Sequence, residues 1–224
     1  MWYLISMERK PVLIRFLVAV TAAAAAVLIA IGAMYKVSIP YARVNALQTE
    51  GRPRIGQLEA RVQLLLIEDL RCEACQYFTQ EIFPEIYERY IQTGRAYCVI
   101  VPVSFLEGSH YLANAALSIY QLAPDHFLSY LHSLVDFDNE NEAGDDIQAQ
   151  LVKLAEKFEG IDFGRLRNLI ETNRFLPELE RNFEWAKSVM GKNFGTPAFY
   201  VNGIRTPTSI EAIEAQIEKA ERKR

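Results

Sequence analysis

The sequence predicts an α/β fold with a central sheet and an all-helical insertion, and three observations carry this prediction. Residues 60–67 and 97–105 contain apolar runs of the kind that form central strands covered on both faces. Residues 73–93, between them, have apolar positions at helical spacing, so the three segments form a right-handed βαβ unit. A long stretch with only helical signals follows, and strand character returns at 197–206.

The N-terminus contains the longest apolar segment of the chain. Residues 16–35 form a run of twenty residues without a charge. At about 1.5 Å per residue, a helix of this length spans about 30 Å, the thickness of a bilayer core. Arg9, Lys10 and Arg15 precede it, so the positive-inside rule predicts a cytoplasmic N-terminus, residues 1–15, and an exported remainder.

A cleaved signal peptide is the alternative to a transmembrane anchor at 16–35. Signal peptides usually have apolar regions of only ~7–15 residues. The best cleavage candidate, residues 31–33 (IGA), has a large residue where a small one is preferred. The anchor is therefore favoured, and the domain is exported in both cases. Whether the chain starts at Met1 or at Met7 is left open.

Residues 36–55 predict a linker that ends in a strand or turn, because two prolines and a glycine lie among polar residues without sustained periodicity. The folded domain is then predicted at 56–224, with its helical insertion at about 106–192. Within the first helix, at 73–93, Pro84 predicts a kink because proline disrupts the helical hydrogen bonding.

The C-terminal segment predicts a hairpin followed by a helix. Residues 197–201 are strand-like, and Asn202-Gly203 is the strongest short hairpin signal in the chain. Ser209 caps an amphipathic helix that runs to about Arg222.

Cys72 and Cys75 lie where the first apolar strand gives way to the helical pattern. A Cys-x-x-Cys pair at the start of a helix places its first sulfur near unpaired backbone N–H groups and the positive end of the helix dipole. Both favour the thiolate, which is the nucleophile of disulfide exchange. The pair therefore predicts a dithiol redox centre. Export strengthens this prediction, because a disulfide can cycle outside the reducing cytosol.

Two alternatives remain for the pair. A structural zinc site normally needs four protein ligands, and the other candidates, Cys98 and the three histidines, are not paired at ligand spacing. A static structural disulfide is the second alternative. Three cysteines are too few for a disulfide-stapled scaffold. The formal net charge of −4, with scattered basic residues, argues against a nucleic-acid binder.

Residues 68–75 (EDLRCEAC) and 195–203 (GTPAFYVNG), with a helical insertion between them, resemble the DsbA-type thiol:disulfide oxidoreductases of the thioredoxin superfamily. The resemblance covers roughly residues 55–223. It implies a thioredoxin-like fold, with a mixed sheet flanked by helices. It also implies that Pro197 follows a cis peptide bond beside the cysteines, and that Thr196 offers its backbone to a substrate peptide as an added strand.

The chain departs from this family at three places. Glu73 and Ala74 stand where the prototype has proline and histidine. A carboxylate beside Cys72 disfavours its thiolate, so we expect redox tuning toward a milder oxidant. Leu66 occupies the position where relatives often have a buried acid, for which Glu68 or Glu73 are candidate substitutes. Cys98 falls inside an apolar strand and is expected to be a buried, inert thiol.

The sequence thus predicts an anchored thiol:disulfide oxidoreductase on the periplasmic or extracytoplasmic face of the plasma membrane. It would be a mild oxidant of cysteine-containing exported proteins, with no cofactor or metal, and a monomer. Reoxidation would need a membrane redox partner resembling DsbB. The alternatives are a disulfide reductase or isomerase, and a non-catalytic anchored binding or chaperone module with a structural disulfide.

Overall fold

The computed structural model describes residues 15, 18–21, 51–140 and 146–222. The chain divides into two compact units, Met1–Pro40 and Tyr41–Arg224. Residues 18–21 are helical, whereas the rest of the predicted membrane segment 16–35 lies outside the described residues. The predicted cytoplasmic end lies outside them too, except for Arg15. Within the described part of the chain, no helix is long and apolar enough to cross a membrane.

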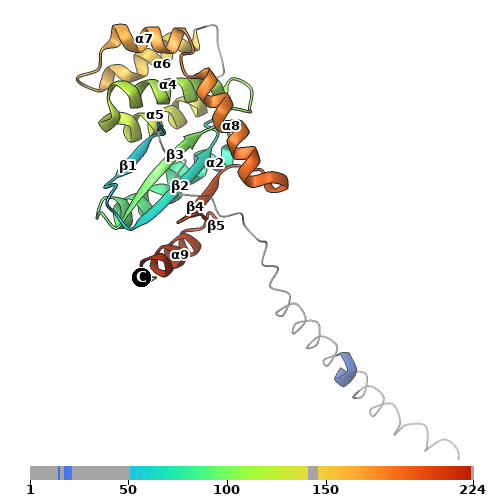
Figure 1. The fold of residues 1–224 in the computed structure, drawn as a ribbon. Helices are drawn as coiled ribbons and strands as arrows, with labels where there is room; N and C mark the ends of the chain where they lie inside the picture. Colours follow the sequence, from blue (N-terminus) through green and yellow to red (C-terminus); the bar gives the residue numbers. More distant parts are fainter. Residues whose placement is uncertain (1–14, 16–17, 22–50, 141–145, 223–224) are drawn as a thin grey trace, which may run out of the picture. The chain divides into compact units, whose positions relative to one another are not determined.

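In the described part of the second unit, a five-stranded sheet has the strand order β1-β3-β2-β4-β5. Its strands are β1 (Arg54–Gly56), β2 (Val62–Glu68), β3 (Ala96–Pro102), β4 (Ala198–Val201) and β5 (Ile204–Thr206). β2 and β3 run parallel and the other neighbouring strands run antiparallel, so the sheet is mixed, as predicted. Helices lie around this sheet (Figure 1).

Strand β2 is the centre of the domain, and each of its seven residues is buried. Successive side chains of a strand point to opposite faces. Leu64 and Leu66 accordingly belong to one hydrophobic core, and Leu65 and Ile67 to another. The first core includes side chains of α9 (Ile210–Arg222), and the second includes those of α8 (Leu176–Met190). The predicted two-sided burial of this strand is confirmed.

The helical run after β2 contains two π-helical segments that the apolar periodicity does not predict. Its parts are α2 (Glu73–Tyr77), η1 (Phe78–Ile82), α3 (Phe83–Ile86) and η2 (Tyr87–Ile91), of which η1 and η2 are π-helical. Pro84 lies in the first turn of α3, directly after η1. Phe83 N donates to Phe78 O across this junction, so the helical run is continuous, and Pro84, which has no N–H to donate, follows the π-helical turn.

The helical insertion lies between β3 and β4 in the chain. Its elements are α4 (Ser109–Leu122), η3 (Pro124–His126), α5 (Phe127–Glu140), α6 (Ile147–Leu154), η4 (Ala155–Lys157), α7 (Phe163–Glu171), α8 and η5 (Gly191–Asn193). Helices α4 to α7 gather at one end of the sheet (Figure 1). The aromatic side chains of Phe127 and Tyr130 are fully buried there and form part of the first core.

The strand or turn expected at the end of the linker is β1, whose last residue lies at the predicted domain boundary, residue 56. Arg54 pairs with Val99 and Gly56 with Tyr97 in antiparallel register. The backbone of Pro53 also accepts a hydrogen bond from Ile100 N at 2.9 Å. A three-residue edge strand without a buried apolar run has no periodic signal, so the sequence predicts only a strand or turn here and not its bounds.

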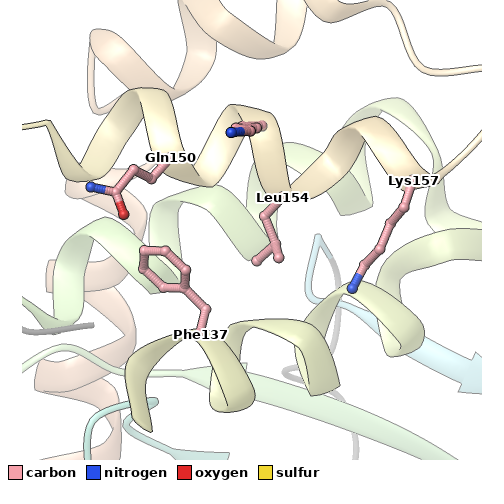
Figure 2. A pocket seen from close by; sticks show the side chains of 5 residues that line it. Phe137, Gln150, Leu154 and Lys157 are labelled. Atoms are coloured by element: carbon pink, nitrogen blue, oxygen red, sulfur yellow. The ribbon is translucent and has the colours of Figure 1, made fainter. Parts of the chain in front are cut away.

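A pocket lies within the helical insertion (Figure 2). Its lining consists of Phe137 from α5, Gln150, Lys153 and Leu154 from α6, and Lys157 from η4. None of the predicted site residues lines it.

Candidate active site

Cys72 is the N-cap residue of α2, with extended backbone (φ −80°, ψ 116°). Its carbonyl accepts hydrogen bonds from Cys75 N at 2.8 Å and Gln76 N at 2.9 Å, which closes the first helical turn. Cys72 is half-buried, whereas Cys75 is only 1% exposed. Both are free thiols, as is Cys98. One sulfur of the pair is therefore accessible at the helix start, and the other is covered.

The turn that carries Cys72 is anchored by Asp69, a residue that no motif or periodicity marks in the sequence. The backbone carbonyl of Asp69 accepts a hydrogen bond from Cys72 N at 3.0 Å. Its fully buried carboxylate accepts four more, from Arg71 N at 3.0 Å, Phe105 N at 2.9 Å, Leu106 N at 3.1 Å and Ser109 Oγ at 2.9 Å. Asp69 thus fixes the cysteine turn and the loop before α4 to each other.

We expect Asp69→Asn to lower the free energy of unfolding by about 2–3 kcal/mol, because buried donors lose their acceptor and the new amide donors face them. Chemical denaturation of the full chain at neutral pH measures this loss. Asp125→Asn, at an exposed position in η3, is the matched control and should leave stability within about 0.5 kcal/mol of wild type. Equal stability of the two variants would contradict the anchoring role of Asp69.

Thr196 and Pro197 lie beside Cys72, although they are far from it in sequence. The Thr196–Pro197 peptide bond is cis, as the resemblance implies. Cys72 Sγ donates a hydrogen bond to Thr196 O at 3.6 Å. The register explains the proximity: β4 begins just after Pro197, and Ala198 pairs with Ile67 near the end of β2.

Glu73 and Ala74 occupy the first turn of α2 between the two cysteines, and both are exposed. The two side chains that distinguish this pair from the prototype therefore face solvent. Glu73 therefore does not provide the buried acid that relatives often have at the position of Leu66.

Glu68, the last residue of β2, is a fully buried acid near the cysteine pair. Burial is the main cause that raises its pKa to about 7. Burial also raises the pKa of the Cys75 thiol far above its ordinary value, and the charge of Glu68 adds to this rise. In the sequence, Glu68 is only one of two candidate substitutes for the acid that relatives often have at the position of Leu66.

Cys98 lies on β3, where it pairs with Leu64 of β2 and is fully buried. Burial raises the pKa of its thiol. This agrees with the expectation of a buried thiol within an apolar strand.

Exposed apolar side chains lie on two segments next to the cysteine turn, the loop bonded to Asp69 and helix α2. Phe105 and Leu106, held by Asp69, are 40% and 37% exposed, and Tyr77 of α2 is 62% exposed. The ring of Phe105 packs against Phe194 at 5.4 Å between centroids. Phe194 lies two residues before Thr196, so this aromatic contact adjoins the backbone next to Cys72. In the sequence, Tyr77 falls in the predicted helix at 73–93 and Phe105 ends the predicted strand at 97–105, but no motif marks either as a site residue.

A family model described as thioredoxin matches residues 48–219, which is most of the chain. The match contains the complete sheet, the cysteine pair and the helical insertion. The chain belongs to the thioredoxin family.

Several relatives and solved structures indicate which kind of thioredoxin-family protein this chain resembles. Disulfide bond formation protein D of Bacillus subtilis is 25% identical over 173 residues, covering 76% of this chain and 77% of the relative. A putative protein-disulfide oxidoreductase of Rickettsia felis is 25% identical over 167 residues, covering 74% and 59%. The crystal structure of Chlamydia trachomatis DsbA matches with a TM-score of 0.69 and 28% identity, over 76% of this chain and 91% of that one.

The oxidised BdbD of Bacillus subtilis supports the same fold, with a TM-score of 0.71 and 24% identity, over 80% of this chain and 97% of that one. Within the thioredoxin family, the chain is a thiol:disulfide oxidoreductase of the DsbA type.

Proposed function

We propose that the chain exchanges disulfides with exported proteins through Cys72 and Cys75, with Cys72 as the nucleophile. The observation that carries this proposal is the contrast between the two sulfurs. Cys72 is half-buried at the start of α2 and contacts Thr196 O, whereas Cys75 is 1% exposed and its thiol has a raised pKa. Only the accessible sulfur can meet a protein thiol, and the covered one is suited to closing the pair.

As an oxidant, the pair starts as a disulfide. A substrate thiolate attacks Cys72, the Cys72–Cys75 bond breaks, and Cys75 takes the electron pair. The second substrate thiolate then attacks the substrate sulfur of the mixed disulfide and releases Cys72. Two electrons have moved from the substrate dithiol to the pair, and the substrate holds a new disulfide.

Thr196 and Pro197 are the proposed substrate-binding residues. A peptide lying beside Thr196 as an added strand would place its cysteine at Cys72, because the Thr196 carbonyl is already within 3.6 Å of that sulfur. Phe105 and Leu106, whose backbone is bonded to Asp69, and Tyr77 of α2 are exposed apolar side chains, and they suit unfolded chains, whose apolar residues are still exposed.

Export and membrane anchoring belong to this proposal. They are supported by the uncharged run at 16–35 and the basic residues before it. An extracytoplasmic location is also favoured by the names of the relatives, disulfide bond formation protein D and protein-disulfide oxidoreductase, because disulfides persist outside the cytosol. An anchor would hold the domain close to a membrane partner resembling DsbB, which would reoxidise the pair.

The test is direct transfer of a disulfide. The oxidised full chain is mixed with a reduced peptide that contains two cysteines, and both products are weighed by mass spectrometry. We expect the peptide to lose two mass units while the protein gains two. A static structural disulfide would leave both masses unchanged and would contradict the proposal.

The proposed mild oxidising power depends on Glu73. We expect Glu73→Gln to make the pair about threefold more oxidising against glutathione, or about 15 mV, because an exposed carboxylate beside Cys72 no longer opposes its thiolate. Equilibration with glutathione buffers measures the change. Glu81→Gln, at an exposed position further along the same helical run, is the control and should not shift the equilibrium. An unchanged or more reducing potential for Glu73→Gln would contradict this role.

A further inference from the structure

The pocket in the helical insertion is a cavity of about 460 Å³ with an apolar part and a polar part. Phe137 and Leu154 form the apolar part, and both are half-buried against the first hydrophobic core. Figure 2 shows these two side chains pointing into the space between α5 and α6. Gln150, Lys153 and Lys157 form the polar part and are exposed. Cavities of this size, apolar with a few polar groups, are typical of sites for small organic molecules.

The two lysines of the lining place two positive charges beside the apolar part. Lys153 and Lys157 lie four residues apart, and both line the cavity. Within the part of the chain that the structure describes, neither amine forms an ion pair. The Lys157 amine contacts the ring of Phe158, at 5.5 Å from its centroid. Like charges one helical turn apart repel each other, so an anion bound between the amines would stabilise this arrangement.

No carboxylate of the described lining neutralises these charges, because none of those residues is acidic. Asp136 precedes Phe137 on α5, but its Oδ1 accepts a hydrogen bond from Gln80 Nε2 at 3.0 Å. That carboxylate is therefore directed toward η1. The whole chain has a formal net charge of −4, so general attraction of anions to its surface is not expected. The positive charge at the cavity is a local feature.

We propose that this cavity binds an anionic amphiphile, which is a carboxylate with an aliphatic chain. Phe137 and Leu154 contact the chain, and the amines of Lys153 and Lys157 pair with the carboxylate. The side-chain amide of Gln150 donates a hydrogen bond to the same group. A neutral apolar ligand would leave the lysines unpaired, and a small inorganic anion would leave the apolar part empty. This inference does not rest on the proposed function of the cysteine pair.

Photolabelling of the full chain tests the site directly. The probe is dodecanoate with a diazirine near the end of its chain, and the protein is held in phosphatidylcholine nanodiscs because of its apolar N-terminal segment. After irradiation, mass spectrometry maps the labelled residues. We expect saturable labelling within residues 137–157, which excess dodecanoate suppresses. Dodecyltrimethylammonium and acetate at the same concentration should not suppress it, because one lacks the negative head group and the other lacks the chain.

Lys153→Gln/Lys157→Gln should lower this labelling about fivefold, because the carboxylate loses both cationic partners. Lys192→Gln/Lys219→Gln is the matched control, since it removes the same charge from two exposed lysines outside the cavity and should keep the wild-type labelling. The first variant should also keep the wild-type rate of insulin turnover, because neither lysine contacts the cysteine pair. Unchanged turnover shows that its fold is intact.

Labels scattered over the whole surface would overturn the inference. Wild-type labelling in Lys153→Gln/Lys157→Gln would overturn it too, as would suppression by dodecyltrimethylammonium equal to that by dodecanoate. A wild-type chain that is labelled in the cavity but does not turn over insulin would contradict only the proposed function of Cys72 and Cys75, and it would support the amphiphile site.

Discussion

Cys72→Ser reduces disulfide exchange to the uncatalysed background. A serine hydroxyl at this position cannot form the mixed disulfide, and Cys75 cannot take over because it is covered and its thiol has a raised pKa. The loss is chemical and not structural, since the Cys72 thiol makes one long hydrogen bond, to Thr196 O at 3.6 Å. We expect the free energy of unfolding to stay within about 1 kcal/mol of the reduced wild type.

Turnover of insulin disulfides in the presence of a thiol reductant measures this effect. Cys98→Ala is the matched control, because it removes the remaining cysteine from the buried face of β3. It should cost about 1–2 kcal/mol of stability through the lost packing and still catalyse exchange. Exchange that survives in Cys72→Ser, or is lost in a folded Cys98→Ala, would refute the assignment of the nucleophile.

The second large effect is the accumulation of trapped complexes in Cys75→Ala. Cys72 can still attack a substrate disulfide, but no buried thiol remains to release the substrate from it. Mixed disulfides between Cys72 and substrate proteins should therefore persist, whereas wild type resolves them. Non-reducing electrophoresis of the full-length variant, followed by mass spectrometry of the linked peptides, identifies the cysteine that carries each adduct.

The double variant Cys72→Ser/Cys75→Ala controls for adducts at other positions. It should form none, because Cys98 is fully buried. Adducts on Cys98 would show that the core opens under the assay conditions. Adducts in the single variant at a cysteine other than Cys72 would contradict the proposed order of attack.

The sequence predicts the parts of this fold that have a strong local pattern. The buried runs in β2 and β3 show in the sequence because both faces of a central strand need apolar residues. β1 is too short and too polar to produce such a pattern. The π-helical turns after Cys75 depend on how the helix packs against the sheet, and hydrophobic spacing cannot distinguish them from α-helix.

The residues of the candidate site also differ in whether a local sequence pattern predicts them. Cys72 and Cys75 form a local motif at a strand-to-helix junction, whereas only the order of motifs in a family links Thr196 to them. Glu68 and Asp69 are adjacent acids with different environments. The carboxylate of Asp69 accepts four hydrogen bonds, whereas that of Glu68 accepts one. This difference arises from contacts with residues distant in sequence, such as Ser109.

The redox potential of the Cys72–Cys75 couple, measured on the full chain in glutathione buffers, tests the central claim most directly. A working pair of a mild oxidant should equilibrate at about −230 to −150 mV, more reducing than the ≈ −120 mV of the family's strong oxidant. A value below about −300 mV would identify a static structural disulfide and contradict the proposed exchange function.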